Sequence, residues 1–286
     1  MQFAVPAPWR RIVLVVLLLG LASCSSTTFF YNRLDFLVPW YVEDYVDLDR
    51  MQEVFLEEQL NPFLDWHRRE ELPRYVETVD LIEDAVSDSL EEEELLAIQE
   101  DFEAAYRRLE ARGMEWMLAL GGELTDEQMD EFLDSLQERQ EEFEEEYLDR
   151  DAEEFVQDSY DNLVDNLEDY LGGLGKEQEM VARRAAEDLV RADAAWLDEQ
   201  SRWLAQLRVF LQREPGWEER LKTAVAVREQ NFTPEYAAAI EHNTQVLYQT
   251  VSEIINSRSE KQDKALREKL GELREDLLAL AAQQVD

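Results

Sequence analysis

The chain has 286 residues, of which 45% are hydrophobic and 33% charged, and its formal net charge at pH 7 is −39. This apolar content can build a sizeable core and excludes a disordered acidic tail. Such acidity repels nucleic-acid phosphates and anionic lipid headgroups, so both are poor partners. The acidic composition, with only five lysines, also suggests a salt-adapted source, in which ions screen the self-repulsion.

The first 23 residues have the layout of a cleaved secretory leader. Arg10 and Arg11 precede a short aliphatic run at residues 12–21, and small residues follow this run. A basic start, a short apolar core and a small-residue region are typical of a signal peptide. The apolar run is shorter than the roughly 20 residues that a transmembrane helix needs. We therefore expect residues 1–23 to be removed.

The only cysteine, Cys24, stands at the end of this leader. The sequence "LASC" resembles a bacterial lipobox, whose cysteine receives diacylglycerol and then usually a third acyl chain. A thiolate is the nucleophile that such chemistry needs, and two acyl chains already suffice for stable anchoring. Serine at position 25 resembles the sorting signal of outer-membrane lipoproteins that face the periplasm. The alternative is an ordinary leader that ends near a cysteine.

Residues 24–46 form the expected lipid anchor and aromatic tether. Seven aromatic side chains lie between residues 27 and 46. Amphipathic aromatics favour a membrane–water interface, but large rings also commonly cover the end of a helical bundle. Asp35, Glu43 and Asp44 would resist an anionic surface. The packed arrangement is therefore the favoured interpretation, and the interfacial one stays open.

Residues 47–286 are expected to form a single helical domain. Apolar residues recur at steps of three and four over residues 95–120, 129–147, 160–171, 189–210 and 236–277. This spacing predicts amphipathic helices. The last pattern predicts a helix of about 45 residues, roughly 65–70 Å long. The sequence thus predicts an all-α fold, an elongated helical bundle with long coiled-coil-like helices.

Several helix starts are marked by capping sequences. "DRMQ" (residues 49–52) and "TDEQ" (residues 125–128) fit capping boxes, and "GKEQ" (residues 175–178) repeats the pattern with a weaker glycine cap. "TPEY" places proline at the first helical position. The sequences "LGGELT", "LGGLG" and "REPGW" predict turns, which gives boundaries near residues 47, 123, 174 and 215–233. The likeness between "LTDEQ" and "LGKEQ" indicates either a weak duplication or, as we favour, shared capping chemistry.

The most site-like stretch is "DWHRREELPRY", residues 65–75. Arg68, Arg69 and Arg74 are candidates for contacting an anion or a partner, because guanidinium groups suit carboxylate and phosphate. His67 belongs to the same candidate site but lacks a recognisable partner motif for general-base chemistry. The simpler interpretation is that these arginines pair with carboxylates on adjoining helices and that His67 is packed.

Motifs for catalysis and for metal binding are missing from the sequence. Glu-x-x-His and H-E-x-x-H metal motifs do not occur, and a single cysteine cannot form a cysteine-pair site or an internal disulfide. Nucleophile-elbow and phosphate-loop patterns are also missing. We therefore expect no cofactor, no metal, no small-molecule substrate and no enzymatic activity.

The order of these features resembles an uncharacterised proteobacterial lipoprotein family, domain-of-unknown-function family 6279. The likeness rests on the lipobox, then "YNRLDFLVPWYVEDYVDLDRMQ", "WHRREELPRY" and "LTDEQMDEFLDSLQERQEEFEEEYLD". It is clearest from Tyr31 to about Phe210, and its most specific parts are the Tyr31–Asn32 pair and the "WHRREELPRY" block. The resemblance implies an all-helical envelope protein and transfers no catalytic residue.

Two functions follow as expectations. The first is a lipid-anchored, non-catalytic outer-membrane lipoprotein whose periplasmic helical domain acts as a scaffold or interaction module, with the membrane and an unidentified protein as partners. The second is a chaperone or foldase that binds partly folded polypeptide. Leu124, Thr125 and Gln128 match the L-T-x-x-Q motif of small periplasmic stress chaperones, which this short stretch resembles weakly. A chaperone should expose an apolar cleft larger than ordinary surface patches.

Overall fold

The computed structural model describes residues 26–283, so the leader and Cys24 lie outside the described residues. Within residues 26–283 the secondary structure is helical and includes no strand, which confirms the all-α prediction. The elements are α2 (Ser26–Tyr31), α3 (Leu34–Glu43), α4 (Arg50–Trp66), a π-helical turn (His67–Glu71), α5 (Leu72–Ala85), α6 (Glu92–Glu123), α7 (Asp126–Tyr147), α8 (Ala152–Leu171), α9 (Lys176–Asp188), α10 (Asp193–Phe210), α11 (Trp217–Ala226), a 3-10 turn (Glu229–Asn231), α12 (Pro234–Asn256) and α13 (Glu260–Ala281).

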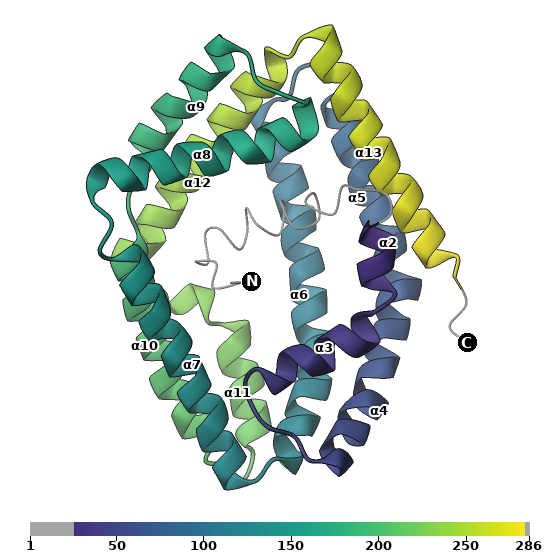
Figure 1. The fold of residues 1–286 in the computed structure, drawn as a ribbon, viewed down its shortest axis with the longest axis vertical. Helices are drawn as coiled ribbons and strands as arrows, with labels where there is room; N and C mark the ends of the chain where they lie inside the picture. Colours follow the sequence, from purple (N-terminus) through teal and green to yellow (C-terminus); the bar gives the residue numbers. More distant parts are fainter. Residues whose placement is uncertain (1–25, 284–286) are drawn as a thin grey trace.

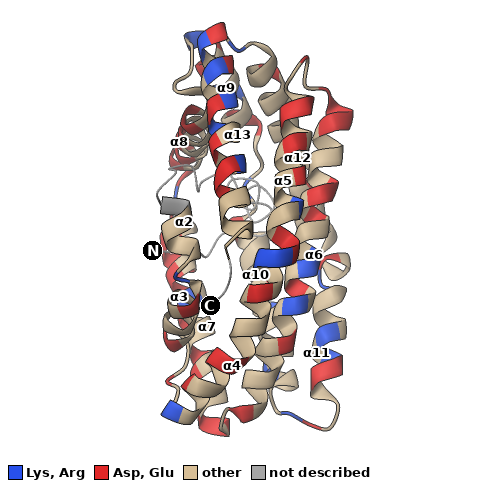
Figure 2. Cartoon of the chain, turned by 90° about the vertical axis from the view of Figure 1, so that its right-hand side faces the viewer, with Lys and Arg blue, Asp and Glu red and all other residues tan. Residues whose placement is uncertain are grey.

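The helices form an elongated frame with α6 running through its middle (Figure 1). Helices α4, α5 and α13 make one long side, and α7 and α10 make the other, while α8, α9 and α12 close one end. Helices α2 and α13 lie on the same side of the frame, because α13 packs along α5 and also contacts α2. Acidic residues are spread over the visible helices and outnumber the basic ones (Figure 2).

The apolar core is divided into four clusters. The largest joins α5, α6, α8, α9, α12 and α13 and includes the fully buried Ile254 and Leu280. The other three are centred on Leu56, Leu133 and Phe143. Phe143 illustrates their packing, because its ring centroid lies 4.1 Å from that of Trp196 and 4.3 Å from that of Tyr147. The frame is thus held by separate patches of buried apolar surface.

Two pairs of helix starts are locked to one another through the glutamine at the third helical position of each helix. The predicted boxes at Asp49 and Thr125 are present, and their glutamines bond each other, since the side-chain nitrogen of Gln52 lies 2.8 Å from Oε1 of Gln128. At the opposite end, Gln178 accepts from Gln262 at 2.7 Å. A helix start therefore satisfies its own backbone and also fixes a neighbouring helix.

The predicted 45-residue helix at the C-terminal end is wrong, because the chain breaks into α12 and α13. The hydroxyl of Ser259 caps α13 by accepting from the backbone N–H of Gln262, whose side chain bonds back to the Ser259 N–H. This capping box starts a new helix, and α13 turns back along α5. The apolar periodicity continues across the break and so conceals it. The longest helix is α6, with 32 residues.

The predicted turn at "LGGELT" is shorter than expected. Helix α6 continues through Gly121 and ends at Glu123, because Gly121 here serves close packing. A Cβ added at Gly121 would lie 3.3 Å from the ring of Trp217, which is tighter than ordinary van der Waals contact. The "LGGLG" turn is present, and Gly172 ends α8 with a φ of 67°, a conformation that glycine adopts without strain.

Candidate functional site

The predicted site residues begin in a π-helical turn between α4 and α5. Here the N–H of Leu72 donates to the carbonyl of His67, five residues earlier. Pro73 follows directly and has no N–H to donate, so the ordinary hydrogen-bond ladder cannot continue unchanged. Such π-turns often occur at functional sites. This one presents His67 and Arg68 to the N-terminal segment of the chain.

His67 and Arg68 hold the residues at the end of α2. The hydroxyl of Tyr31 lies 2.9 Å from Nδ1 of His67, and the guanidinium of Arg68 lies 5.0 Å from the centre of the Tyr31 ring. Arg68 also donates to Oδ1 of Asn32 at 3.2 and 3.3 Å and to Oε1 of Gln283 at 2.8 Å. We call Tyr31, Asn32, His67 and Arg68 the tether clamp.

Burial sets the protonation of the tether clamp. It lowers the pKa of His67 to about 4, although the nearby Glu71 acts in the opposite direction. It raises the pKa of Tyr31 to about 12. Both groups are therefore neutral at pH 7, and Tyr31 can donate to Nδ1 when Nε2 carries the ring proton. That Nε2 lies 3.4 Å from the hydroxyl of Tyr75.

The other two predicted arginines do not converge on the tether clamp. Arg69 pairs with Asp65 at 2.8 Å and its side chain is 67% exposed. Arg74 pairs with Glu71, which is fully buried. The same carboxylate receives Nε of Arg108 at 2.9 and 3.0 Å, and this bonding raises the pKa of Arg108. Of the four predicted residues, His67 and Arg68 thus contact the N-terminal segment, whereas Arg69 and Arg74 form ion pairs within the frame.

The favoured packed arrangement of the aromatic tether is wrong for most of its rings. The tether itself, residues 26–46, does pack on the frame, since Val46 belongs to the cluster around Leu56. Helix α3, however, has no buried residue, and Phe36 and Trp40 are 65% and 55% exposed. Three further exposed rings are Phe29, Phe30 and Tyr41. These rings lie in the same N-terminal segment as Tyr31 and Asn32 of the tether clamp.

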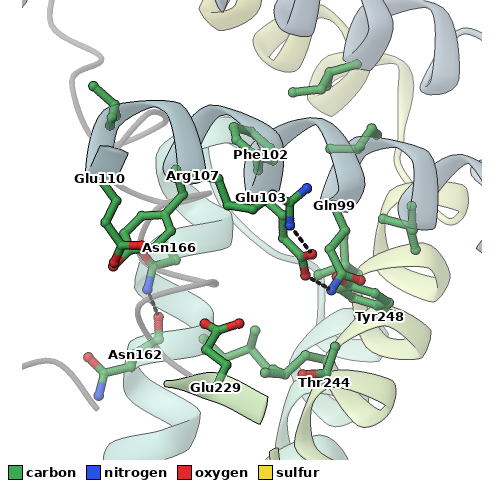
Figure 3. A pocket seen from close by; sticks show the side chains of 18 of the residues that line it. Gln99, Phe102, Glu103, Arg107, Glu110, Asn162, Asn166, Glu229, Thr244 and Tyr248 are labelled. Atoms are coloured by element: carbon green, nitrogen blue, oxygen red, sulfur yellow. Dashed lines mark hydrogen bonds and ion pairs between the residues drawn. The ribbon is translucent and has the colours of Figure 1, made fainter. Parts of the chain in front are cut away.

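A large cavity runs along one face of α6. Its volume is about 830 Å³, within the range of sites that bind small molecules. The wall from α6 is an apolar stripe, and α8 and α12 supply the facing walls (Figure 3). The stripe consists of Ile98, Phe102, Tyr106, Leu109, Gly113 and Met117. We call this space the α6 cavity.

Polar groups are distributed along the α6 cavity (Figure 3). Gln99 donates to Glu103 at 2.7 Å, and Arg107 pairs with the same carboxylate at 3.4 Å. Two buried polar atoms in the wall, the indole N–H of Trp116 and the hydroxyl of Tyr170, find no hydrogen-bond partner within residues 26–283. Unsatisfied buried donors are costly, by roughly 1–3 kcal/mol each. These two buried groups therefore impose a local free-energy cost on the wall of the cavity.

Sequence reasoning identified the tether clamp in part and missed the α6 cavity. The apolar periodicity of α6 predicted a core-facing helix, and Ile98 and Phe102 are indeed buried. Periodicity cannot distinguish a face that packs on another helix from one that borders a cavity. The available signal was the glycine within the stripe, Gly113, together with the polar residues Gln99, Glu103 and Glu110, which directly follow stripe positions. The buried Glu71 was also missed, because its acidic neighbours gave no reason to single it out.

The fold and these sites define an all-α frame with a docked N-terminal segment and an internal apolar cavity. In the part of the chain that is described, no helix is long and apolar enough to span a bilayer, and no His, Cys, Asp and Glu side chains cluster in a way that could hold a metal. No curated protein and no solved structure matches the chain. The chain belongs to a family of unknown function, DUF6279, whose model matches residues 44–237.

Proposed function

We propose that the chain is a lipid-anchored, non-catalytic lipoprotein of the bacterial outer membrane that faces the periplasm. Its helical frame acts there as a scaffold or interaction module. The lipobox-like sequence ending at Cys24 supports the anchor, and the diacylated cysteine would hold the chain at the membrane without a transmembrane helix. The shared family adds no activity, because its function is unknown.

The observation that carries this proposal is the tether clamp. Helix α2 begins at Ser26, two positions after Cys24, and Tyr31 and Asn32 are bound by His67 and Arg68. A lipidated Cys24 would thus be separated from a fixed point of the frame by only seven residues, which can span at most about 25 Å. The frame would stand at the membrane in a defined position instead of on a long flexible linker.

The exposed rings of α2 and α3 agree with a membrane partner. Aromatic side chains are favoured at the headgroup level of a bilayer, and Phe36 and Trp40 lie four residues apart on one helix face. Asp35 and Glu43 on the same helix disfavour a strongly anionic surface. A neutral, zwitterionic surface therefore suits this segment best.

The anchor is tested by metabolic labelling with an alkyne analogue of palmitate, followed by separation of inner and outer membranes. We expect label on the wild-type chain in the outer membrane and none on the Cys24→Ser variant. The Ser25→Ala variant is the matched control and should keep its label and its location. Label on Cys24→Ser, or an unlabelled wild-type chain free of membranes, would disprove the anchoring.

A second candidate function, a chaperone or foldase, is favoured by the α6 cavity. An apolar space of about 830 Å³ is the kind of surface that an unfolded client would bind. In this case the purified chain should suppress the aggregation of several unrelated heat-denatured proteins at near-stoichiometric ratios. Protection of none of them would exclude a general chaperone and leave the scaffold proposal intact.

A further inference from the structure

The α6 cavity extends along α6 and opens partly to solvent. The stripe from Ile98 to Met117 covers 19 helical steps, or about 29 Å. A whole helix of that length and about 10 Å in diameter would occupy roughly 2,200 Å³. The cavity volume of about 830 Å³ is much smaller, so the cavity suits side chains from one face of a helix and not a whole helix. Met117 is 43% exposed, and the side chain of Arg107 is 62% exposed. An occupant can therefore enter from the side.

The spacing of the apolar residues in the stripe matches the spacing found where a groove binds an amphipathic helix. Its residues follow one another at steps of three and four along α6, as an amphipathic helix does when it lays its apolar face in a groove. Met114 and Met117 line the same wall, and methionine adapts its shape to varied apolar partners. The helices α8 and α12 stand opposite as the groove's other walls (Figure 3).

The polar groups of the wall favour a polypeptide over an acyl chain. A fatty chain carries polar atoms at one end only, so it can form hydrogen bonds at only one point along the wall. The wall amides, such as Gln99, already bond neighbouring side chains but keep further donor and acceptor sites along the whole cavity. In the α6 cavity, Gln99 and Glu110 are 11 positions apart on α6, about 16 Å, and Asn162, Asn166 and Thr244 line the other walls. A polypeptide offers donors and acceptors along its whole length.

The charge of the cavity walls indicates which kind of polypeptide would bind there. The cavity walls contain Glu103, Glu110 and Glu229 against Arg107 and Arg228, which leaves an excess of negative charge. The chain as a whole carries a net charge of −39, so a basic partner is attracted from a distance and an anionic one is repelled.

From these observations we propose that the α6 cavity binds an amphipathic polypeptide helix with an apolar face and basic flanks. This inference rests on the proposed function. It assigns a chemical class to the partner that the interaction module would bind. The apolar side chains of the partner enter the cavity along α6. Its lysine or arginine side chains remain at the mouth near the acidic residues.

The experiment uses the full chain, lipidated by its host and reconstituted in phosphatidylcholine nanodiscs. The photoreactive residue p-benzoylphenylalanine replaces Met117 in the cavity or, as a control, the 60% exposed Met180 on α9. The probe is a biotinylated 18-residue leucine–lysine peptide with a helical amphipathic pattern. A peptide of the same composition in scrambled order and one with glutamate in place of lysine are the comparisons. The amount of peptide adduct is measured after irradiation.

We expect at least tenfold more adduct at position 117 than at position 180, and at least fivefold less with either comparison peptide. Thr244→Trp, which fills the cavity from α12, should lower the yield at least fivefold, whereas Gln245→Trp on the exposed neighbour should not. Asn166→Trp and its exposed neighbour Asp165→Trp form a second matched pair, in case the first variant unfolds. Circular dichroism checks the fold of each variant.

Equal adduct at the two positions, or adduct that persists in both filled variants, would overturn the proposal. An adduct at position 117 with phosphatidylcholine instead of the peptide would also overturn it and would assign the cavity to lipid. The mass of the purified chain reports the lipid on Cys24 separately. A lipidated chain without peptide adduct contradicts only the partner, and an unlipidated chain contradicts the anchoring.

Discussion

Acidification is expected to weaken the tether clamp through His67. This side chain has a pKa of about 4 in the folded protein, against about 6.5 in an unfolded chain. The folded pKa is the lower one, so below pH 6.5 the unfolded state binds a proton that the folded state refuses. The stabilisation is complete above about pH 6.5 and is lost as the pH falls towards 4. Between pH 7 and pH 5 the loss is about 2 kcal/mol.

The assay is urea denaturation of the wild type and of His67→Gln at pH 7 and pH 5. Many carboxylates also titrate as the pH falls, so the informative quantity is the difference between the two proteins. Glutamine has no charged form, and the free energy of unfolding of His67→Gln should therefore fall by about 2 kcal/mol less than that of the wild type. The exposed His242 is common to both proteins and cancels.

The result that refutes this reasoning is an equal loss of stability in the two proteins. Such a result would mean that His67 is protonated in the folded protein as easily as in water. The charged groups nearest to it are Glu71, which favours the protonated form, and Arg68, which disfavours it. Nuclear magnetic resonance of the His67 ring carbons across the same pH range gives an independent check of its pKa.

Three further outcomes are expected. Glu71→Gln should lower the free energy of unfolding by about 3 kcal/mol in urea, since it leaves Arg108 without its buried carboxylate, and an effect below 1 kcal/mol would contradict a structural role. Gln52→Ala should cost about 2 kcal/mol, because it removes both a capping box and the bond to Gln128; Gln137→Ala, at an exposed position, is the control and should cost little. The melting temperature should rise between low salt and molar salt as ions screen the net charge of −39, and a constant value would argue against salt adaptation.

Local chemistry made the helix starts predictable. The caps at Asp49, Thr125 and Thr233 are present as the sequence indicates, because a capping box involves only four consecutive residues. The break at Ser259 is of the same kind but lies inside an unbroken apolar pattern, which masked it. Local sequence also cannot show that the glutamine of one box bonds the glutamine of another, since those residues are 76 positions apart.

Prediction of the candidate site from local sequence was limited in the same way. The block around His67 stands out by composition, but its contact with Tyr31 joins residues 36 positions apart. The exposure of Trp40 depends on which face of α3 the frame covers, and the sequence does not specify that face. The α6 cavity depends on how α6, α8, α12 and several further helices are spaced around it. A periodic pattern indicates that one face of a helix is apolar. Only the packed structure shows whether that face contacts another helix, a cavity or solvent.

The frame is closed by α13, the last helix of the described residues. Arg274 on α13 pairs with Asp80 on α5, 194 positions earlier, and the α13 leucines complete the largest apolar cluster. A growing chain therefore carries an uncovered α5 until α13 has been made (Figure 1). Contacts so distant in sequence form slowly. The largest apolar cluster is therefore complete only after α13 has been synthesised and has packed against α5.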